Sequence, residues 1–352
     1  DIGLIERIGY IYVYITVENN IELLRTAGKI YFYLYEYEER DQNILVKYLK
    51  RGIDLLFRKD ISFIDKILIV YAELTPKDSK KVNQVRMEYS NTYNYSRRVL
   101  LKTIFDSFRF SEGITLPFSD DSPNPDEVIR CFFSGCNEMF YSNIYKLDKL
   151  LDDNDVIIDG GGNIGLFSIY SKNLRKNISC LIFEPEIHNF KALKKNLENY
   201  ENIKLFNEGL FNIISEGDLL ISDNVLDHKL NSKLIDFDLQ AYYYDNQKIK
   251  LNTIDNVVFS TEIKKIDLIK LDIEGSELLA LKGGVKTIEK YSPLLLVAVD
   301  HAKEEREKVI KFIRDHFKHY SFTEFTFSGY RNVLFYNPKK HLSRINRLEK
   351  VK

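Results

Sequence analysis

The chain has 352 residues, 44% of them hydrophobic, so it is long enough for two domains and apolar enough to bury a full core. Its 51 lysines and arginines against 52 aspartates and glutamates give a net charge of −1, which excludes a domain-wide basic field for nucleic acid. No apolar run approaches the roughly 20 residues of a membrane span. Cys131, Cys136 and Cys180 lack metal-ligand spacing and indicate reduced thiols in a cytoplasmic protein.

The N-terminal third of the sequence indicates helices. Residues 1–108 contain a single proline, Pro76, and repeat apolar stretches broken by charged turns. Two tyrosine-rich stretches, at 10–14 and 31–37, alternate like strands and fit this pattern least well. We expect residues 1–112 to form a smaller, mainly α-helical domain that offers a surface to a protein partner.

A proline-rich stretch marks the next boundary. Three of the seven prolines lie between Gly113 and Pro125, around the polar run 119–122, and this composition disfavours regular structure. We therefore expect a second domain at 113–338, followed by a basic C-terminal tail at 339–352. A solvated helix is the simpler interpretation of that tail, and contact with an acidic partner or membrane surface is the alternative.

The most distinctive stretch begins the second domain's sheet. Residues 155–165 read Asp-Val-Ile-Ile-Asp-Gly-Gly-Gly-Asn-Ile-Gly, a short apolar strand that ends in an acid and breaks into glycines before a helix. Glycines permit positive φ and the close approach of a ligand, and the helix start offers N–H groups. The pattern predicts a nucleotide-cofactor loop, although a plain strand-to-helix turn with incidental glycines remains an alternative. The residues expected to bind the cofactor here are Asp159, Gly160, Gly161, Gly162, Asn163 and Ile164.

A second acid supports the same site. The strand expected at 178–183 ends in Glu184 and Pro185, which places a carboxylate 19 residues after Gly165, where ribose hydroxyls are held by dinucleotide and S-adenosylmethionine sites alike. Asp159 separates the two cofactors, because an acid beside the glycines suits an ammonium and a sulfonium but repels a pyrophosphate. S-adenosylmethionine is therefore the expected cofactor, and Glu208, beyond the third strand, is a further expected contact.

The rest of the domain alternates strands and helices. The parallel strands are expected at 155–159, 178–183, 202–206, 266–271 and 294–299. Two more, at 320–327 and 332–336, flank a Ser-Gly-Tyr-Arg turn and read as a closing antiparallel hairpin. This order predicts an α/β fold with a doubly wound, mostly parallel, seven-stranded Rossmann-like sheet.

A polar insertion interrupts the alternation at 212–252. It contains few helix signals, and in an open α/β sheet it would overhang the carboxyl ends of the strands, where ligands bind. We interpret it as a substrate lid that includes Asp227, His228 and the tyrosines at 242–244. A variable surface loop is the alternative interpretation.

The fourth expected strand carries a second motif. Residues 267–277 read Asp-Leu-Ile-Lys-Leu-Asp-Ile-Glu-Gly-Ser-Glu, followed by Leu-Lys-Gly-Gly. Together with the glycine loop, Phe-Glu-Pro at 183–185 and Asn-Thr-Ile-Asp at 252–255, this motif closely resembles the FkbM family of S-adenosylmethionine-dependent methyltransferases. The resemblance covers roughly residues 128–337 and implies a class I methyltransferase sheet.

The sequence departs from the family pattern at two places. The family usually has Gly-Ala after the first-strand acid, where this chain has three consecutive glycines, and this change should leave cofactor binding intact. The family tends to carry Glu, one or two residues and then His after the fifth strand, where this chain has Asp300-His301. The second departure leaves the roles on that strand open.

The resemblance implies an O-methyltransferase that acts on a hydroxyl of a sugar, glycan or secondary metabolite, often beside surface-polysaccharide synthesis. The small-molecule or glycan acceptor would be its substrate, with no nucleic acid partner. A non-catalytic methyltransferase-fold protein that serves as a binding or scaffold module is the alternative. A nicotinamide-dependent oxidoreductase is a third, weaker interpretation.

Methyl transfer needs an aligned acceptor and the removal of one proton. Asp272, at the end of the fourth strand, is the expected proton acceptor, and Lys270 lies two residues earlier on the same strand face, where it would assist. Glu274 and Glu277 are alternative acids, although Glu277 could serve only to favour a helix N-terminus. His301 is a further catalytic candidate after the fifth strand. A purely structural ion pair between Lys270 and one of these acids is the competing explanation.

A divalent metal is the least certain expectation. Asp272 ends one strand and Asp300-His301 ends the next, positions where catechol-type O-methyltransferases place magnesium ligands. Oxygen ligands would suit magnesium or manganese, and His301 would favour manganese or another transition metal. The alternative, in which Asp300 and His301 bind the acceptor or cap the helix that starts near Lys303, requires fewer ligands.

Overall fold

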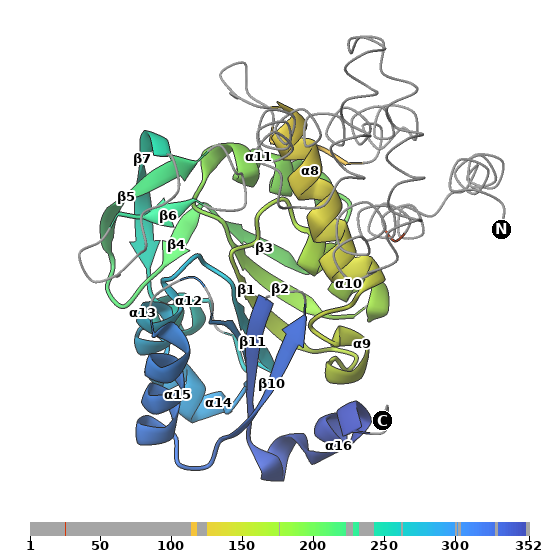
Figure 1. Cartoon of the computed structure of the whole chain (residues 1–352). Helices are drawn as coiled ribbons and strands as arrows, with labels where there is room; N and C mark the ends of the chain where they lie inside the picture. The colour runs from red at the N-terminus through yellow and green to blue at the C-terminus, as the bar shows by residue number, and fades with distance from the viewer. Residues whose placement is uncertain are drawn as a thin grey trace, which may run out of the picture.

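The computed structural model describes most of the second half of the chain (Figure 1). The described residues are 25, 114–117, 125–175, 177–222, 228–231, 243–261, 263–299, 301, 304–327 and 330–349. Apart from Arg25, the predicted helical domain at 1–112 therefore lies outside the described residues.

A seven-stranded sheet forms the centre of the described region, in the order β10-β11-β9-β8-β1-β2-β3. Strands β1, β2, β3, β8 and β9 are parallel, β11 is antiparallel to β9, and β10 is antiparallel to β11. The predicted doubly wound sheet with a closing antiparallel hairpin is confirmed. The strands span Val156–Gly160 (β1), Ser179–Phe183 (β2), Ile203–Phe206 (β3), Leu268–Leu271 (β8), Leu294–Ala298 (β9), Ser321–Phe327 (β10) and Tyr330–Tyr336 (β11).

Helices cover both faces of this sheet, because its central strands carry apolar side chains on both sides. Ile157 packs into a core with the helices of one face, and Ile158 packs into a second core on the other face. The first face carries α8 (Pro125–Cys136), the π-helical turn η2 (Asn137–Tyr141), α9 (Leu147–Leu150), α10 (Leu166–Leu174) and α11 (Ile187–Asn196). The second carries α12 (Ile254–Ser260), α13 (Glu277–Lys282), α14 (Val285–Tyr291) and α15 (Glu305–His316). None of the described helices is both long and apolar enough to cross a membrane.

The predicted insertion forms a second, four-stranded sheet in the order β4-β7-β5-β6. Its strands are Glu208–Leu210 (β4), Ser215–Ser222 (β5), Lys229–Leu230 (β6) and Tyr243–Asn252 (β7). In Figure 1 this small sheet lies beside α12 and α13, at one end of the large sheet. A separate apolar cluster stabilises it, formed by Phe211, Leu219, Ile221, Leu230, Ile249, Leu251 and Leu279.

The basic C-terminal segment is a docked helix, α16 (Pro338–Glu349). The guanidinium group of Arg344 donates two hydrogen bonds to Asp155, at 2.7 and 2.8 Å, and lies 2.9 Å from Asp152. Arg347 lies 2.8 Å from Asp152 and donates to the carbonyl oxygen of Lys149. The segment is helical, as the simpler interpretation of the tail expected, and these two arginines pack it against the domain itself. Residues 350–352 lie outside the described part of the chain.

Candidate active site

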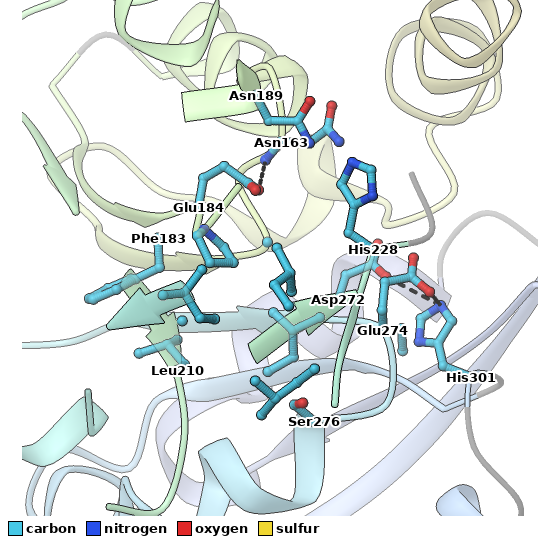
Figure 2. Close-up of a pocket in the computed structure, with 18 of the residues that line it drawn as sticks. Asn163, Phe183, Glu184, Asn189, Leu210, His228, Asp272, Glu274, Ser276 and His301 are labelled. Carbon is cyan, nitrogen blue, oxygen red and sulfur yellow. Dashed lines mark hydrogen bonds and ion pairs between the residues drawn. The ribbon is translucent and has the colours of Figure 1, made fainter. Parts of the chain in front are cut away.

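A pocket of about 330 Å³ opens where strands β1, β2 and β8 end at their carboxyl termini (Figure 2). Its wall comes from the glycine loop, from the α8–η2 segment and from the small sheet β4–β7. The location agrees with the rule that open α/β sheets bind ligands beyond the carboxyl ends of their strands.

The glycine loop is held tightly against its neighbours. Gly161 has φ of 76°, and a Cβ atom there would lie 1.9 Å from the carbonyl oxygen of Asp272, so only glycine fits. The N–H groups of Gly161 and Gly162 donate to the carbonyl of Phe183 at 3.1 and 2.9 Å. The next N–H, of Asn163, donates to Glu184.

These contacts bear on which cofactor the loop suits. A pyrophosphate needs backbone N–H groups that point at the ligand. In this loop those N–H groups bond to the protein, so the loop does not fit a dinucleotide phosphate. These bonded N–H groups distinguish S-adenosylmethionine from a dinucleotide more strongly than the charge of Asp159 does.

Asp159 and Lys270 form a buried ion pair beneath the loop. Their charged groups lie 3.2 Å apart, and their side chains are 0% and 4% exposed. Burial raises the pKa of Asp159 although Lys270 opposes it, and Asp159 also accepts a hydrogen bond from Ser168. Lys270 donates to the carbonyl oxygens of Gly160 and Gly161 at 3.0 and 2.9 Å. The pair ties β1 and its loop to β8, so Lys270 has a structural role, with Asp159 as its partner and not one of the acids at the end of its own strand. Neither residue lines the pocket.

Glu184 lies at the centre of the pocket wall. Its two carboxylate oxygens accept hydrogen bonds from the N–H groups of Asn163 and Glu186, at 2.8 and 2.9 Å. Burial raises its pKa to about 7. Phe183, Pro185 and Leu210 supply apolar surface beside it. A carboxylate next to an apolar wall fits the ribose hydroxyls and the base of an adenosine.

The structure places the predicted cofactor residues in two groups. Those that line the pocket are Gly161, Asn163, Glu184, Pro185 and Glu208. Those that belong to the loop without lining the pocket are Asp159, Gly160, Gly162 and Ile164.

Asp272 lies across the pocket from Glu184, with partners on both carboxylate oxygens. The hydroxyl of Tyr145 donates to its Oδ2 at 2.8 Å, and Nε2 of His301 lies 3.6 Å from its Oδ1. Burial raises the pKa of Tyr145 well above 10, and the charge of Asp272 adds to this effect, so Tyr145 is a donor at neutral pH. Two of the predicted catalytic residues, Asp272 and His301, are thereby brought together.

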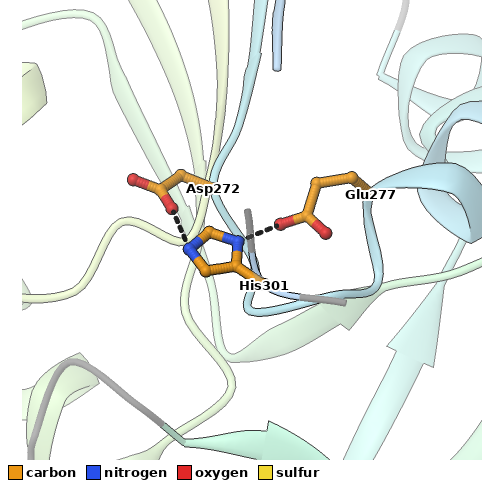
Figure 3. A group of neighbouring side chains, drawn as sticks. All are labelled: Asp272, Glu277 and His301. Carbon is orange, nitrogen blue, oxygen red and sulfur yellow. Dashed lines mark ion pairs between the residues drawn. The ribbon is translucent and has the colours of Figure 1, made fainter. Parts of the chain in front are cut away.

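His301 stands between acids (Figure 3). Its Nε2 lies 3.8 Å from Glu274, and its Nδ1 lies 3.4 Å from Glu277, whose side chain is 0% exposed. Burial lowers the pKa of His301, but the charges of Glu274, Glu277 and Asp272 outweigh burial and raise the pKa well above 6.5. Burial also raises the pKa of Glu277, but His301 outweighs it and lowers the pKa to about 2. At neutral pH a protonated His301 therefore joins these carboxylates.

The small sheet closes the pocket on the side away from the large sheet. Leu219, His228, Leu230, Ile249 and Leu251 line it. The side-chain amide of Gln247 donates to the carbonyl of Pro185 at 3.0 Å, which ties the small sheet to the second-strand segment. The insertion thus lies where a lid was expected, with His228 in the wall; Asp227 and Tyr242 lie outside the described residues.

Comparison with known proteins identifies a family for the part of the chain that builds the site. Residues 159–324 match the sequence model of the Methyltransferase FkbM domain. This domain belongs to the FkbM methyltransferase family.

Curated relatives of the FkbM domain are distant. Methyltransferase 1 of Beauveria bassiana (strain ARSEF 2860) is 24% identical and methyltransferase sdnD of Sordaria araneosa is 26% identical, each over 42% of this chain. The alignments span 64% and 66% of those two proteins, so this chain matches about two thirds of their length. A solved methyltransferase FkbM from Methylobacillus flagellatus KT has a TM-score of 0.42 and 16% identity, over 69% of this chain and 60% of that one.

The FkbM domain brings together two of the three metal ligands expected from sequence. Asp272, Glu277 and His301 form a cluster whose donor atoms lie within 4.8 Å of one another, whereas Asp300 lies outside the described residues. However, Asp272 and Glu277 face opposite ring nitrogens of His301, as Figure 3 shows, and one cation cannot replace the proton on both nitrogens. A protonated histidine between two carboxylates accounts for this cluster, so we derive no step from a metal.

The sequence patterns missed the contribution of the α8–η2 segment and of the turn after it. Arg130, Ser134 and Glu138 line the pocket from the segment and Tyr145 lines it from the turn, although all four precede the first motif. Glu138 was the available signal, because it is an acid within the apolar run 131–140. Asn332, on the closing hairpin, was also missed and has no comparable signal.

Proposed function

We propose that the chain is an S-adenosylmethionine-dependent O-methyltransferase that acts on a hydroxyl of a sugar, glycan or secondary metabolite. The observation that carries this proposal is the placement of Glu184 and Asp272 in one pocket. Glu184, beside an apolar wall, suits the adenosine of the cofactor, and Asp272 supplies a carboxylate on the opposite side. The whole arrangement is built on a domain of the FkbM family.

The cofactor half of the pocket fits S-adenosylmethionine in its donors and shape. The Glu184 carboxylate would accept hydrogen bonds from the ribose hydroxyls, and Phe183, Pro185 and Leu210 would contact the base. When bound, the cofactor supplies a transferable methyl group on a positively charged sulfur. The protein then has to orient the acceptor, exclude water and take one proton.

Asp272 is the residue we assign to that proton. A hydroxyl becomes a competent nucleophile as its proton is removed, and a positioned carboxylate can accept it. Tyr145 and His301 fix the two oxygens of Asp272, at 2.8 and 3.6 Å, so the carboxylate is oriented before the acceptor arrives. The positive charge of His301 also stabilises the negative charges around it.

The lining of the acceptor half suits a small polar acceptor. Glu274 and Asn332 offer hydrogen-bonding groups, while Ile144 and Leu230 offer apolar surface, a mixture that suits a hydroxylated ring. One relative is named AMB antimetabolite synthetase AmbE, from Pseudomonas aeruginosa, which favours a secondary metabolite. Cys131, Cys136 and Cys180 are buried thiols that form no disulfide with one another, which is compatible with a reducing cytoplasm, the compartment we propose.

Calorimetry with the full chain tests the cofactor assignment. S-adenosylmethionine and its demethylated product should bind, and NAD should not. Binding of NAD alone would overturn the proposal. Acceptor panels of sugars, nucleotide sugars and hydroxylated metabolites should then gain one methyl group by mass spectrometry.

Asp272→Asn tests the chemical assignment. The variant should bind the cofactor product as the parent does and lose methyl transfer, because its amide cannot accept the proton. Normal turnover in this variant would refute the role of Asp272. Cofactor binding without turnover on any acceptor would instead favour a scaffold function.

A further inference from the structure

We propose that Glu138 and Arg130, on the α8–η2 segment, recognise the amino-acid end of the cofactor. Glu138 would bind its ammonium group and Arg130 its carboxylate. The inference rests on the proposed function, since it assumes that S-adenosylmethionine occupies the pocket.

The order of the strands indicates where that end lies. Neighbouring strands run β8-β1-β2, so their carboxyl ends place Asp272, the glycine loop and Glu184 side by side in that order. With the ribose at Glu184, the remainder of the cofactor extends over the glycine loop toward β8. Its ammonium and carboxylate groups therefore require partners near Asp272.

The charged pair next to the loop cannot supply these partners. Lys270 has three N–H donors, and they face three acceptors, the carbonyl oxygens of Gly160 and Gly161 and the carboxylate of Asp159. Asp159 is 0% exposed and lies beneath the loop. The expected contact between Asp159 and the cofactor ammonium is therefore replaced, in this proposal, by a residue that faces the pocket.

The α8–η2 segment presents suitable charges on one face. Arg130, Ser134 and Glu138 follow one another at intervals of four residues, and all three line the pocket. The π-helical turn η2 begins at Asn137, immediately before Glu138, and such turns commonly occur at functional positions. Ser134 donates a hydrogen bond to Glu138 at 3.2 Å, which orients the carboxylate.

Glu138 also lies on the correct side of the pocket. The N–H group of Ile144, next to Tyr145, donates to the carbonyl oxygen of Glu138 at 3.0 Å, so Glu138 lies beside the turn whose tyrosine hydroxyl bonds Asp272. Among the described pocket residues the other cationic side chains are histidines, and His301 already faces three acids. Arg130 is the permanently charged one, and its planar group suits a carboxylate.

The test compares ligands that differ only at the amino-acid end. Calorimetry measures the binding of S-adenosylhomocysteine, of its decarboxylated analogue and of methylthioadenosine, which lacks the whole amino-acid end. Glu138→Gln and Arg130→Gln should each weaken S-adenosylhomocysteine roughly tenfold or more, since each removes a charge-assisted hydrogen bond. Both variants should bind methylthioadenosine within about twofold of the parent chain. Arg130→Gln and the parent chain should bind the decarboxylated analogue with the same affinity, because this analogue lacks the carboxylate that Arg130 would bind.

Glu184→Gln is the matched control, because it should weaken S-adenosylhomocysteine and methylthioadenosine alike. Failure of the parent chain to bind any of the three ligands would refute the proposed function. Equal affinity of the parent for S-adenosylhomocysteine and methylthioadenosine would overturn the inference alone. The inference would also be overturned if the Glu138 and Arg130 variants bound S-adenosylhomocysteine with the affinity of the parent. The same holds if they lost affinity for S-adenosylhomocysteine and methylthioadenosine equally while melting at the temperature of the parent. If one variant does not fold, the other decides.

Discussion

At the scale of single residues, the acids of the site differ in their partners and therefore in their roles. Asp159 and Glu277 are fully buried and face a lysine and a histidine, so their charges serve to position the loop and His301. Glu184 is almost as deeply buried, but backbone N–H groups are its hydrogen-bond donors, and its pKa is raised to about 7. It is therefore the acid of the site whose charge is most sensitive to pH near neutrality.

Cofactor affinity should consequently depend on the protonation of Glu184. The ionised carboxylate accepts hydrogen bonds from ribose hydroxyls better than the protonated form does. Because burial raises the pKa of Glu184 to about 7, affinity for S-adenosylhomocysteine should be highest above pH 7 and decline as the pH falls through that value. Calorimetry from pH 5.5 to 8.5 measures this decline, a range of about 1.5 around that pKa.

Glu184→Gln should remove the pH dependence and weaken binding by about 1.5–3 kcal/mol, the usual worth of hydrogen bonds to a charged group. If the variant retained the pH dependence of the parent, the pH dependence of affinity would have to come from a group other than Glu184. An unchanged dissociation constant would show that Glu184 does not contact the cofactor.

His301 provides a second test at this scale. Burial lowers its pKa, and Glu274, Glu277 and Asp272 together raise it well above 6.5. Glu277→Gln should lower the pKa of His301, because it removes a negative charge that lies 3.4 Å from Nδ1. The imidazole signals in an NMR titration measure the shift, with Glu289→Gln, an exposed glutamate on α14, as the control. Equal titration of His301 in both variants would contradict the ion pair.

At the scale of elements, sequence patterns predicted those strands and helices that depend on residues near one another in the sequence. The strand expected at 155–159 is β1, Val156–Gly160, because a run of buried apolar residues followed by glycines has few alternatives. The docking of α16 was not predictable in this way. Arg344 and Asp155 are 189 residues apart in the sequence, and nothing local to either indicates the other.

The contact between α16 and the domain predicts a stability effect. Asp155 is 2% exposed at its side chain, and burial raises its pKa although Arg344 opposes this. Arg344→Ala would leave a buried carboxylate without its guanidinium partner and should destabilise the fold by about 3 kcal/mol. The loss should shrink as the pH falls toward the pKa of Asp155, since a protonated Asp155 needs no cation. Urea unfolding followed by circular dichroism measures it.

Lys339→Ala is the control for this prediction, because Lys339 is an exposed residue on the same helix. It should change the free energy of unfolding by less than about 0.5 kcal/mol. Equal effects of the two substitutions would show that α16 does not depend on the Arg344 contacts.

At the scale of the whole molecule, the pocket is an assembly of segments that are distant in sequence. The glycine loop, Glu184 and Asp272 were predictable, because each follows a strand and parallel strands end at the same edge of a sheet. Glu138 and Tyr145 were not, because they come from η2 and from the turn that follows it, and the packing of this segment over that edge depends on the apolar core it shares with the sheet. The position of the insertion over this edge was predictable, but its small sheet was not. That sheet depends on the pairing of β5 with β7, between residues up to 36 positions apart.

This assembly predicts how the molecule responds to cofactor product. The α8–η2 segment, the glycine loop and the small sheet all line the pocket, so a ligand that fills it should stabilise all three against local opening. Hydrogen exchange with saturating S-adenosylhomocysteine should therefore slow amides at 130–138, at 160–163 and at 247–251. If the α8–η2 segment binds the amino-acid end of the cofactor, methylthioadenosine should not protect the amides at 130–138 from exchange. It should still protect those of the glycine loop. Protection confined to the loop and Glu184 would show that the helix and the small sheet do not close on the ligand.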